Sequence, residues 1–157
     1  MGLTQKEFHK LHFRSMIRTP KTTAEWDAYY QLRFEILRAP WGQALGSEKT
    51  DDETAHQHFA YFNDQQQIIG VIRLDNCAAQ TGQIRFMAVA DAAQRSGIGR
   101  LLMQFVEEKA REQKLNKMIL HAREQALPFY RKLGYQYLER SHLLFGEIQH
   151  HLMFKEI

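Results

Sequence analysis

The clearest chemical signal in the sequence is a glycine-containing segment, residues 84–100, that joins a predicted strand to a predicted helix. A helix N-terminus leaves backbone N–H groups unpaired and carries partial positive charge. Gly97 and Gly99 would let a phosphate approach these N–H groups closely, and Arg95 and Arg100 add positive charge. The segment predicts an anion site, most naturally for a pyrophosphate. The alternative is a glycine-rich helix start that binds nothing.

The spacing of the two glycines separates this segment from two other phosphate-binding loops. No Lys-Ser or Lys-Thr pair follows Gly99, so the segment is not a P-loop. A G-x-G spacing alone also differs from the G-x-G-x-x-G of dinucleotide-binding folds. The spacing by itself therefore indicates an anion and no particular ligand.

Apolar periodicity predicts the elements that position this segment. Residues 22–25 form a capping box, and a helical stripe follows it to about residue 38. The stripe consists of Trp26, Tyr30, Phe34 and Leu37. Further helices are predicted over 98–110 and 125–133, and strands over 12–18, 59–62, 68–74, 84–89, 118–120, 135–145 and 150–154. Residues 1–11 are expected to be a loose extension, 40–52 a loop and 76–82 a turn region. This order is an α+β, or mixed α/β, pattern.

Length, composition and charge exclude several classes of protein. The 157 residues correspond to one domain over 1–157, and 44% of them are hydrophobic, as in soluble globular proteins. A single cysteine, Cys77, excludes an intramolecular disulfide and favours a reducing, cytoplasmic compartment. No apolar run reaches the roughly 18 residues of a membrane helix. The net charge of +3 is mild, and basic residues after position 91 are mixed with acidic ones, which argues against a nucleic-acid partner.

Three ordered segments carry a more specific pattern. Residues 94–99 read Q-R-S-G-I-G, residues 87–89 form the strand before them, and residues 126–135 read A-L-P-F-Y-R-K-L-G-Y. These segments resemble the Q/R-x-x-G-x-G/A loop, the strand beside the pantetheine arm and the A-x-x-F-Y-x-K-x-G-F/Y segment of the GNAT superfamily of N-acetyltransferases. Residues 145–153 are similar to the C-terminal ending of one bacterial subgroup, with Gln149 in place of its usual proline. The resemblance covers roughly residues 12–157. It implies the GNAT fold, a mostly antiparallel twisted sheet of six to seven strands with helices on both faces.

The resemblance implies an enzyme that moves an acetyl group from acetyl-CoA to a primary amine of a small molecule or peptide by direct attack in a ternary complex. Tyr130 matches the family's general acid, with a packing residue as the alternative. A backbone N–H near Ala88 or Val89 would face the thioester oxygen. Arg123 stands where the family often has Asn and could pair with a phosphate. The implied cofactor-binding residues are Met87, Ala88, Val89, Gln94, Arg95, Ser96, Gly97, Ile98, Gly99, Arg100 and Arg123.

The residue that accepts the amine proton is left open by the sequence. The candidates are Glu35, Glu53, His56, His121, Glu147, His150 and a chain of waters. The histidines at 56 and 58 lie beside acidic residues 51–53, but polar clusters at strand edges are far commoner than metal sites, so no metal is predicted. Cys77 has no neighbour that would make it a nucleophile.

Acceptor, assembly and activity also have alternatives. The helical stripe from Trp26 is expected to be core, whereas Trp41 and the acidic residues 51–53 could face a cationic amine. A homodimer through an exposed C-terminal strand stays open. The competing function is a non-catalytic module that binds acyl-CoA as a sensor or partner domain.

Overall fold

The computed structural model describes residues 2–157, whose strands form one seven-stranded sheet in the order β1-β2-β3-β4-β5-β7-β6. β4 and β5 are parallel, whereas the pairs β1–β2, β5–β7 and β6–β7 are antiparallel. The α+β prediction of a six- to seven-stranded, mostly antiparallel sheet is confirmed. The strands are β1 (Ile17–Arg18), β2 (Gln57–Phe62), β3 (Ile68–Ala78), β4 (Thr81–Val89), β5 (Lys117–Arg123), β6 (Gln136–Leu144) and β7 (Ile148–Glu156), and the helices are α1 (Gln5–Ser15), α2 (Thr23–Leu37), α3 (Ile98–Glu112) and α4 (Leu127–Lys132).

Two compact units divide the chain, and strands β3 and β4 contribute to both. The N-terminal unit holds Met1–Arg73 and Phe86–Val106, and the C-terminal unit holds Leu74–Arg85 and Glu107–Ile157. The single domain over residues 1–157 stays a prediction. No helix within residues 2–157 is long and apolar enough to cross a bilayer.

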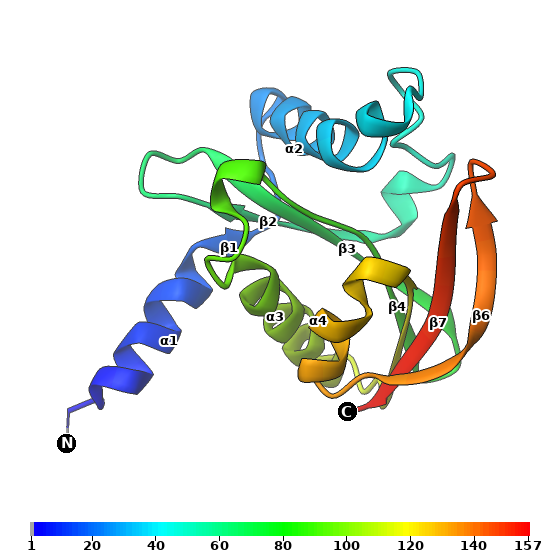
Figure 1. The fold of residues 1–157 in the computed structure, drawn as a ribbon. Coiled ribbons are helices and arrows are strands. Elements are labelled where there is room, and N and C mark those ends of the chain that lie inside the picture. Colours follow the sequence, from blue (N-terminus) through cyan, green and yellow to red (C-terminus); the bar gives the residue numbers. More distant parts are fainter. Residues whose placement is uncertain (1) are drawn as a thin grey trace. The chain divides into compact units, whose positions relative to one another are not determined.

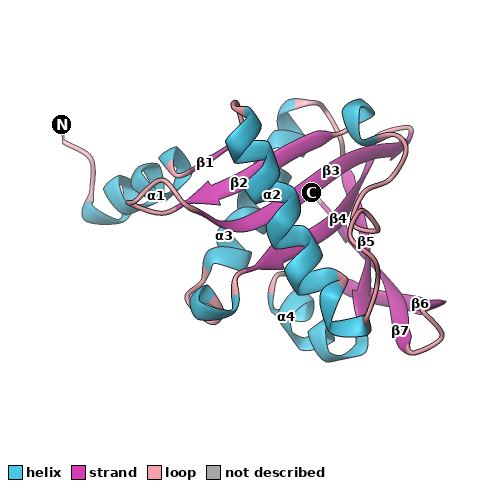
Figure 2. Ribbon diagram, turned by 90° about the horizontal axis from the view of Figure 1, so that it is seen from above, coloured by secondary structure: helices cyan, strands magenta, loops and turns pink. Residues whose placement is uncertain are grey.

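The core of the N-terminal unit lies on both faces of β2 and β3, because successive strand side chains point to opposite faces. Ala60 and Phe62 pack with Tyr29 of α2 on one face. On the other face the Phe59 ring lies 5.1 Å from the ring of Phe105 in α3. Figures 1 and 2 show α2 and α3 on opposite sides of these strands. Gly70 of β3 permits the close approach of α3, since a Cβ there would lie 2.9 Å from the Leu102 side chain.

The C-terminal unit is built around β5, which lies between β4 and β7 in the sheet. Met118 and Leu120 of β5 and Met153 of β7 are buried on one face. Two register shifts interrupt the β6–β7 pairing, between Tyr137 and Glu139 and between Arg140 and Leu143. The second shift releases residues 141 and 142 from regular pairing, and this affects the candidate site.

The N-terminal segment differs from the prediction of a loose extension over 1–11 and a strand over 12–18. Gln5–Ser15 form helix α1, and only Ile17–Arg18 are a strand. The helix begins at a capping box in which the Thr4 hydroxyl accepts from the Glu7 N–H at 3.2 Å. The Glu7 carboxylate accepts the Thr4 N–H in return at 2.8 Å. This local capping signal favours the helix over the predicted strand.

The predicted turn region over 76–82 is also wrong, because β3 runs to Ala78 and β4 begins at Thr81. Gln80 lies between them in the left-handed region with φ 57, which allows a two-residue connection. The other predicted strands and helices are present, with ends that differ by a few residues. The helix predicted over 125–133 begins as a 3-10 turn, Glu124–Ala126, before α4.

Candidate functional site

The predicted anion loop lies in the N-terminal unit, between the end of β4 and the start of α3. The side chain of Gln94 fixes the loop, since Nε2 donates to the Val89 carbonyl at 3.2 Å and to Asp91 Oδ1 at 3.1 Å. The Ser96 hydroxyl donates to the Ala93 carbonyl. Gln94 and Ser96 therefore fix the shape of the loop through hydrogen bonds to residues of the loop and of the end of β4. The backbone N–H groups that follow them remain available to a ligand.

The backbone of this loop presents donors to solvent. Arg95 and Gly97 have positive φ values of 64 and 89, and a Cβ at Gly97 would meet no atom within 4 Å. The first helical bond runs from Leu101 N–H to the Gly97 carbonyl at 3.0 Å, and the N–H groups of residues 98–100 find no acceptor within the described chain. Arg95 and Arg100 are exposed and make no ion pair with residues 2–157. This arrangement fits a pyrophosphate.

The strand before the loop combines buried and half-buried residues. Ala88 is 3% exposed and packs in the core with Val71, so only its backbone can face a ligand. Met87 and Val89 are half-buried. Phe86 has φ 52 within the strand, and its ring lies 4.4 Å from the Arg33 guanidinium. A positive φ at a residue other than glycine is uncommon within a strand, so the surrounding contacts hold the backbone of Phe86 in this conformation.

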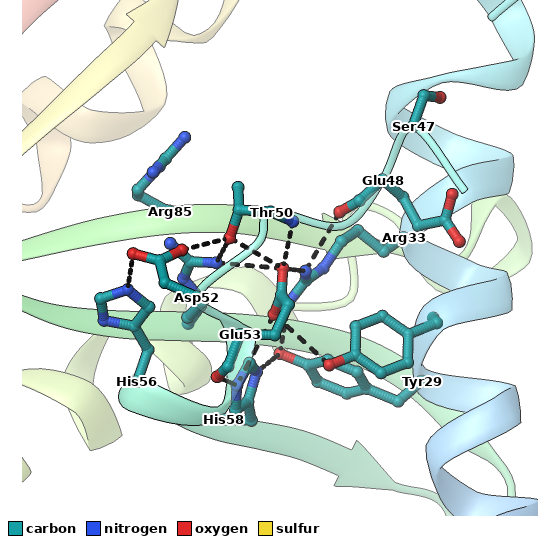
Figure 3. Close-up of polar contacts among 12 residues, drawn as sticks. Tyr29, Arg33, Ser47, Glu48, Thr50, Asp52, Glu53, His56, His58 and Arg85 are labelled. Atoms are coloured by element: carbon teal, nitrogen blue, oxygen red, sulfur yellow. Dashed lines mark hydrogen bonds and ion pairs between the residues drawn. The ribbon is translucent and has the colours of Figure 1, made fainter. Parts of the chain in front are cut away.

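A buried ion cluster lies beside Phe86 in the same unit (Figure 3). Glu53 Oε1 accepts from Arg33 at 2.7 Å, from Arg73 at 3.0 Å and from the Thr50 N–H at 3.0 Å. Both guanidinium groups are fully buried, and the Glu53 side chain is 11% exposed. Burial raises the pKa of Glu53, but the Thr50 N–H and the two arginines outweigh it and lower the pKa overall. Glu53 is therefore a fixed carboxylate and a weak base.

His58 belongs to this cluster as a neutral ring. Burial lowers its pKa. Its Nε2–H donates to the Glu53 carbonyl at 2.7 Å, so Nδ1 accepts from the Tyr29 hydroxyl at 3.0 Å. Nearby, His56 Nε2 lies 2.8 Å from Asp52 Oδ2. Within residues 2–157 no three His, Cys, Asp or Glu side chains are placed to hold a metal ion.

A pocket of about 520 Å³ opens in the N-terminal unit beside this cluster. The predicted stripe of α2 packs against the core only in part: Tyr29, Leu32 and Arg33 are the buried residues of this helix. Trp26 and Tyr30 are half-buried, contacting the core cluster and lining the pocket. Their rings stack with centroids 5.9 Å apart. The pocket is lined by Thr19, Trp26, Tyr30, Glu53, Thr54, His56, Gln57, His58 and Phe59.

Tyr130, in the C-terminal unit, has the protonation state that a general acid needs. It lies on α4 and is 8% exposed. Burial raises the pKa of Tyr130 to about 12, with a smaller opposing effect of the Arg123 charge. Its hydroxyl makes no hydrogen bond within the described chain, whereas the Tyr135 hydroxyl donates to Glu107 at 3.1 Å. Tyr130 is protonated at neutral pH, and its proton is uncommitted.

Three histidines meet on one side of the C-terminal unit. The rings of His142 and His150 stack with centroids 4.5 Å apart, and the ring of His121 lies 5.2 Å from that of His142. His121 Nδ1 lies 2.9 Å from the Ser141 hydroxyl. Burial, the main cause, lowers the pKa of His121 and of His150. The lowered pKa values favour the neutral forms of His121 and His150, which can accept a proton.

The remaining candidate residues are not brought into a site. Glu35 is exposed on α2 and accepts from Gln31 at 2.7 Å, and Glu147 is exposed beside the β6–β7 turn. Cys77 is exposed on β3, and burial of its thiol with the nearby Asp75 charge raises its pKa.

Sequence reasoning missed His142, Arg33 and Arg73. His142 enters the cluster through the register shift in β6, which no sequence pattern reveals. Arg73, by contrast, could have been found from the sequence. It follows the run Ile-Ile-Gly-Val-Ile in β3, and a charge within such a buried strand requires a buried counter-ion.

Comparison with known proteins identifies the family. A family model described as an acetyltransferase (GNAT) domain matches residues 38–157. A Bacillus subtilis (strain 168) protein, provisionally named as an acetyltransferase, is 27% identical over 87% of this chain and 94% of its own length. A Lactobacillus plantarum structure, provisionally named as an N-acetyltransferase, has a TM-score of 0.79 at 20% identity, covering 89% and 96% of the two chains. A Bacillus subtilis acetyltransferase solved with CoA has a TM-score of 0.70 at 16% identity, covering 90% and 97%. With its motifs in the loop and on α4, the chain belongs to the GNAT acetyltransferase family.

Proposed function

We propose that the protein is an acetyl-CoA-dependent N-acetyltransferase that acts on a primary amine of a small molecule or peptide. The observation that carries the proposal is the exposed loop before α3, with free N–H groups at residues 98–100 and the unpaired charges of Arg95 and Arg100. The structural neighbour solved with CoA supports the same cofactor class. The single exposed thiol of Cys77 is consistent with a cytoplasmic location.

The cofactor contacts follow from the loop and strand geometry. Backbone N–H groups at the start of α3 would bind the pyrophosphate, with the two loop arginines adding charge. Gln94 and Ser96 position that backbone through their own hydrogen bonds. Residues 87–89 would run beside the pantetheine arm, and Arg123 would supply a further cation.

The proposed reaction transfers one acyl group and two protons. The amine nitrogen forms a bond to the thioester carbon, and the carbon–sulfur bond breaks. A backbone N–H near Ala88 or Val89 would stabilise the negative charge that develops on the thioester oxygen. Tyr130 donates its proton to the departing sulfur. Its raised pKa keeps the hydroxyl protonated at neutral pH, as this role requires. The amine in turn gives a proton to a base.

The cofactor proposal is tested by calorimetry with acetyl-CoA and free CoA. Wild-type protein is expected to bind both at micromolar concentration, and Gly97→Leu is expected to lose binding. Gly42→Leu is the matched control, because Gly42 also has a positive φ of 66 and open space at Cβ but lies outside the loop. Equal loss in both variants, or no binding by the wild type, would overturn the cofactor site.

Catalysis is tested with a panel of primary amines in an assay for released CoA thiol. Release that depends on both substrates supports the transferase. Tight acetyl-CoA binding without transfer to any amine would instead favour the non-catalytic acyl-CoA-binding module.

A further inference from the structure

Three strands of the C-terminal unit each contribute one imidazole to a single cluster. His121 comes from β5, His142 from β6 and His150 from β7. Arg123 pairs with His150 in the β5–β7 register, and His121 lies two residues earlier on the same strand face. The register shift in β6 brings His142 between them, 5.2 Å from His121 and 4.5 Å from His150. We call these three residues the imidazole cluster.

The ring geometry of the imidazole cluster suits proton transfer better than metal binding. A metal ion needs nitrogen lone pairs, which lie in the ring planes, to point at one centre. The rings of His142 and His150 are stacked at an interplanar angle of 15°, so they face one another instead. The Nδ1 of His150 lies 3.0 Å from the Ile148 carbonyl, and because a carbonyl only accepts, this nitrogen carries the proton. The Nε2 of neutral His150 therefore keeps its lone pair.

The cluster lies at the point where two parallel strands stop pairing. β4 and β5 are paired from Thr81↔Lys117 to Ile84↔Leu120, and both strands continue beyond this point. The next residue of β5 is His121, and the next residue of β4 is Arg85. His121 is therefore the first residue of β5 beyond the parallel ladder.

Resting on the acetyltransferase activity proposed above, we infer that His121 accepts the proton lost by the attacking amine, and that His142, whose ring packs beside it, is a positioning residue. The Nδ1 of His121 faces the Ser141 hydroxyl, so Nε2 is the ring nitrogen left to take the proton. The resulting imidazolium donates from Nδ1 to the Ser141 oxygen. The exposed His142 beside it provides a route for the proton to solvent.

The surroundings of the cluster favour the neutral forms of His121 and His150. Burial lowers the pKa of His121, and electrostatic interactions with His142 and Arg85 lower it further. Burial also lowers the pKa of His150, against a hydrogen bond to Ile148, with His142, Arg123 and His121 adding to the lowering. Arg85 lies 3.9 Å from Asp75, which partly balances its charge. A histidine with a lowered pKa stays unprotonated at pH values where an ordinary histidine is already half protonated. It therefore remains available as a base at those pH values.

The test replaces His121 by Gln and measures kcat/KM for the best amine across pH. We expect about a 100-fold loss at pH 7 with unchanged acetyl-CoA affinity, since a positioned general base contributes at least this much. The loss should shrink at high pH, where the amine has already lost its proton, and added imidazole should restore part of the rate. His12→Gln, on the exposed helix α1, is the matched control and should leave the rate unchanged.

His142→Gln tests the positioning role without removing the base. His142 lowers the pKa of His121, so its removal should raise that pKa and move the acid limb of the kcat/KM profile to higher pH, with little change on the plateau. The exposed position of residue 142 makes this variant safe for folding if His121→Gln proves unstable. An active wild type with His121→Gln within threefold at every pH, or an unmoved acid limb in His142→Gln, overturns the inference alone. A wild type that binds acetyl-CoA but acetylates no amine overturns the proposed function as well.

Discussion

Two clusters of buried polar side chains, one in each unit, differ in how their atoms are occupied. In the N-terminal unit Glu53, Arg33 and Arg73 form a paired-charge cluster, in which a single carboxylate oxygen accepts from both guanidinium groups and a backbone N–H. In the imidazole cluster, His150 is held by one backbone carbonyl and His121 by one hydroxyl. In the first cluster the shared carboxylate oxygen accepts three hydrogen bonds, whereas the second cluster keeps ring nitrogens open.

This difference separates two uses of buried polarity. A buried charge must be compensated, so the charge-paired cluster holds α2, β3 and the segment around Glu53 together, and its carboxylate has little capacity for further chemistry. Neutral imidazoles need fewer partners, so they can be half-buried while a nitrogen stays reactive. Whether a buried titratable residue has a structural or a reactive role is therefore best judged from which of its polar atoms still lack a hydrogen-bond partner.

The largest expected effect comes from removing the shared carboxylate of the paired-charge cluster. Glu53→Gln removes the carboxylate that both buried guanidinium groups, Arg33 and Arg73, share, which should lower the free energy of unfolding by about 3–5 kcal/mol. Urea unfolding followed by circular dichroism would measure this loss. Asp51→Asn, at an exposed position two residues away, should change the stability by no more than about 0.5 kcal/mol. Similar small values for both variants would contradict a structural role for Glu53.

The next effect applies the same distinction to two buried tyrosines of the C-terminal unit. Tyr130→Phe removes a hydroxyl that has no partner within residues 2–157, so we expect kcat to fall about 100-fold with unchanged stability and acetyl-CoA affinity. Tyr135→Phe removes the donor to Glu107 and should lower stability by about 1 kcal/mol, with kcat largely preserved. Thiol-release kinetics measure kcat, and urea unfolding measures stability, for both variants. An unchanged kcat in Tyr130→Phe would make Tyr130 a packing residue.

How much the sequence predicts depends on whether the signal is local. The order of elements from β2 onward, the loop before α3 and the start of α2 at Thr22 are confirmed, because periodicity and capping act within a few residues. The helix α1 carries an equally local capping signal at Thr4 and Glu7, which the prediction of a loose extension over 1–11 overlooked. Local signals therefore suffice for the elements and for the loop.

The polar clusters depend on contacts between distant residues, so the sequence predicts them only in part. His121 and His150 were both candidates for the base, but nothing in their spacing shows that a register shift in β6 inserts His142 between them. Glu53 was a candidate base too, and only the approach of Arg33 and Arg73 shows why it is a fixed anion. The chemistry of a carboxylate or an imidazole is set by its partners. Both arginine partners of Glu53 are 20 residues away from it in the sequence.

The smallest effect, and the finest test of the comparison, is the pH dependence of stability. The folded-state pKa values of His121, His150 and His58 lie below the ordinary value of 6.5. Below pH 6.5 these histidines therefore bind protons in the unfolded chain but remain largely unprotonated in the folded chain, so the free energy of unfolding falls as the pH is lowered. The limit is about 1.4 kcal/mol per pH unit for each ring. Glu53, whose folded pKa is lowered from 4.5, adds its own loss only below that pH.

Replacing both His121 and His150 by Gln should therefore flatten the fall between pH 6.5 and 5.5 and leave the part due to His58. Urea unfolding at pH 7.5, 6.5 and 5.5 measures the slopes of the two proteins, and the wild-type value above pH 6.5 serves as the common reference. Glu53→Gln should keep the wild-type slope in this window while losing stability at every pH above 4.5, because its carboxylate is already ionised there. An undiminished slope in the double variant would mean that the imidazole cluster takes up protons in the folded state as easily as in the unfolded chain. The two clusters would then no longer differ in the property that assigns one to structure and the other to proton transfer.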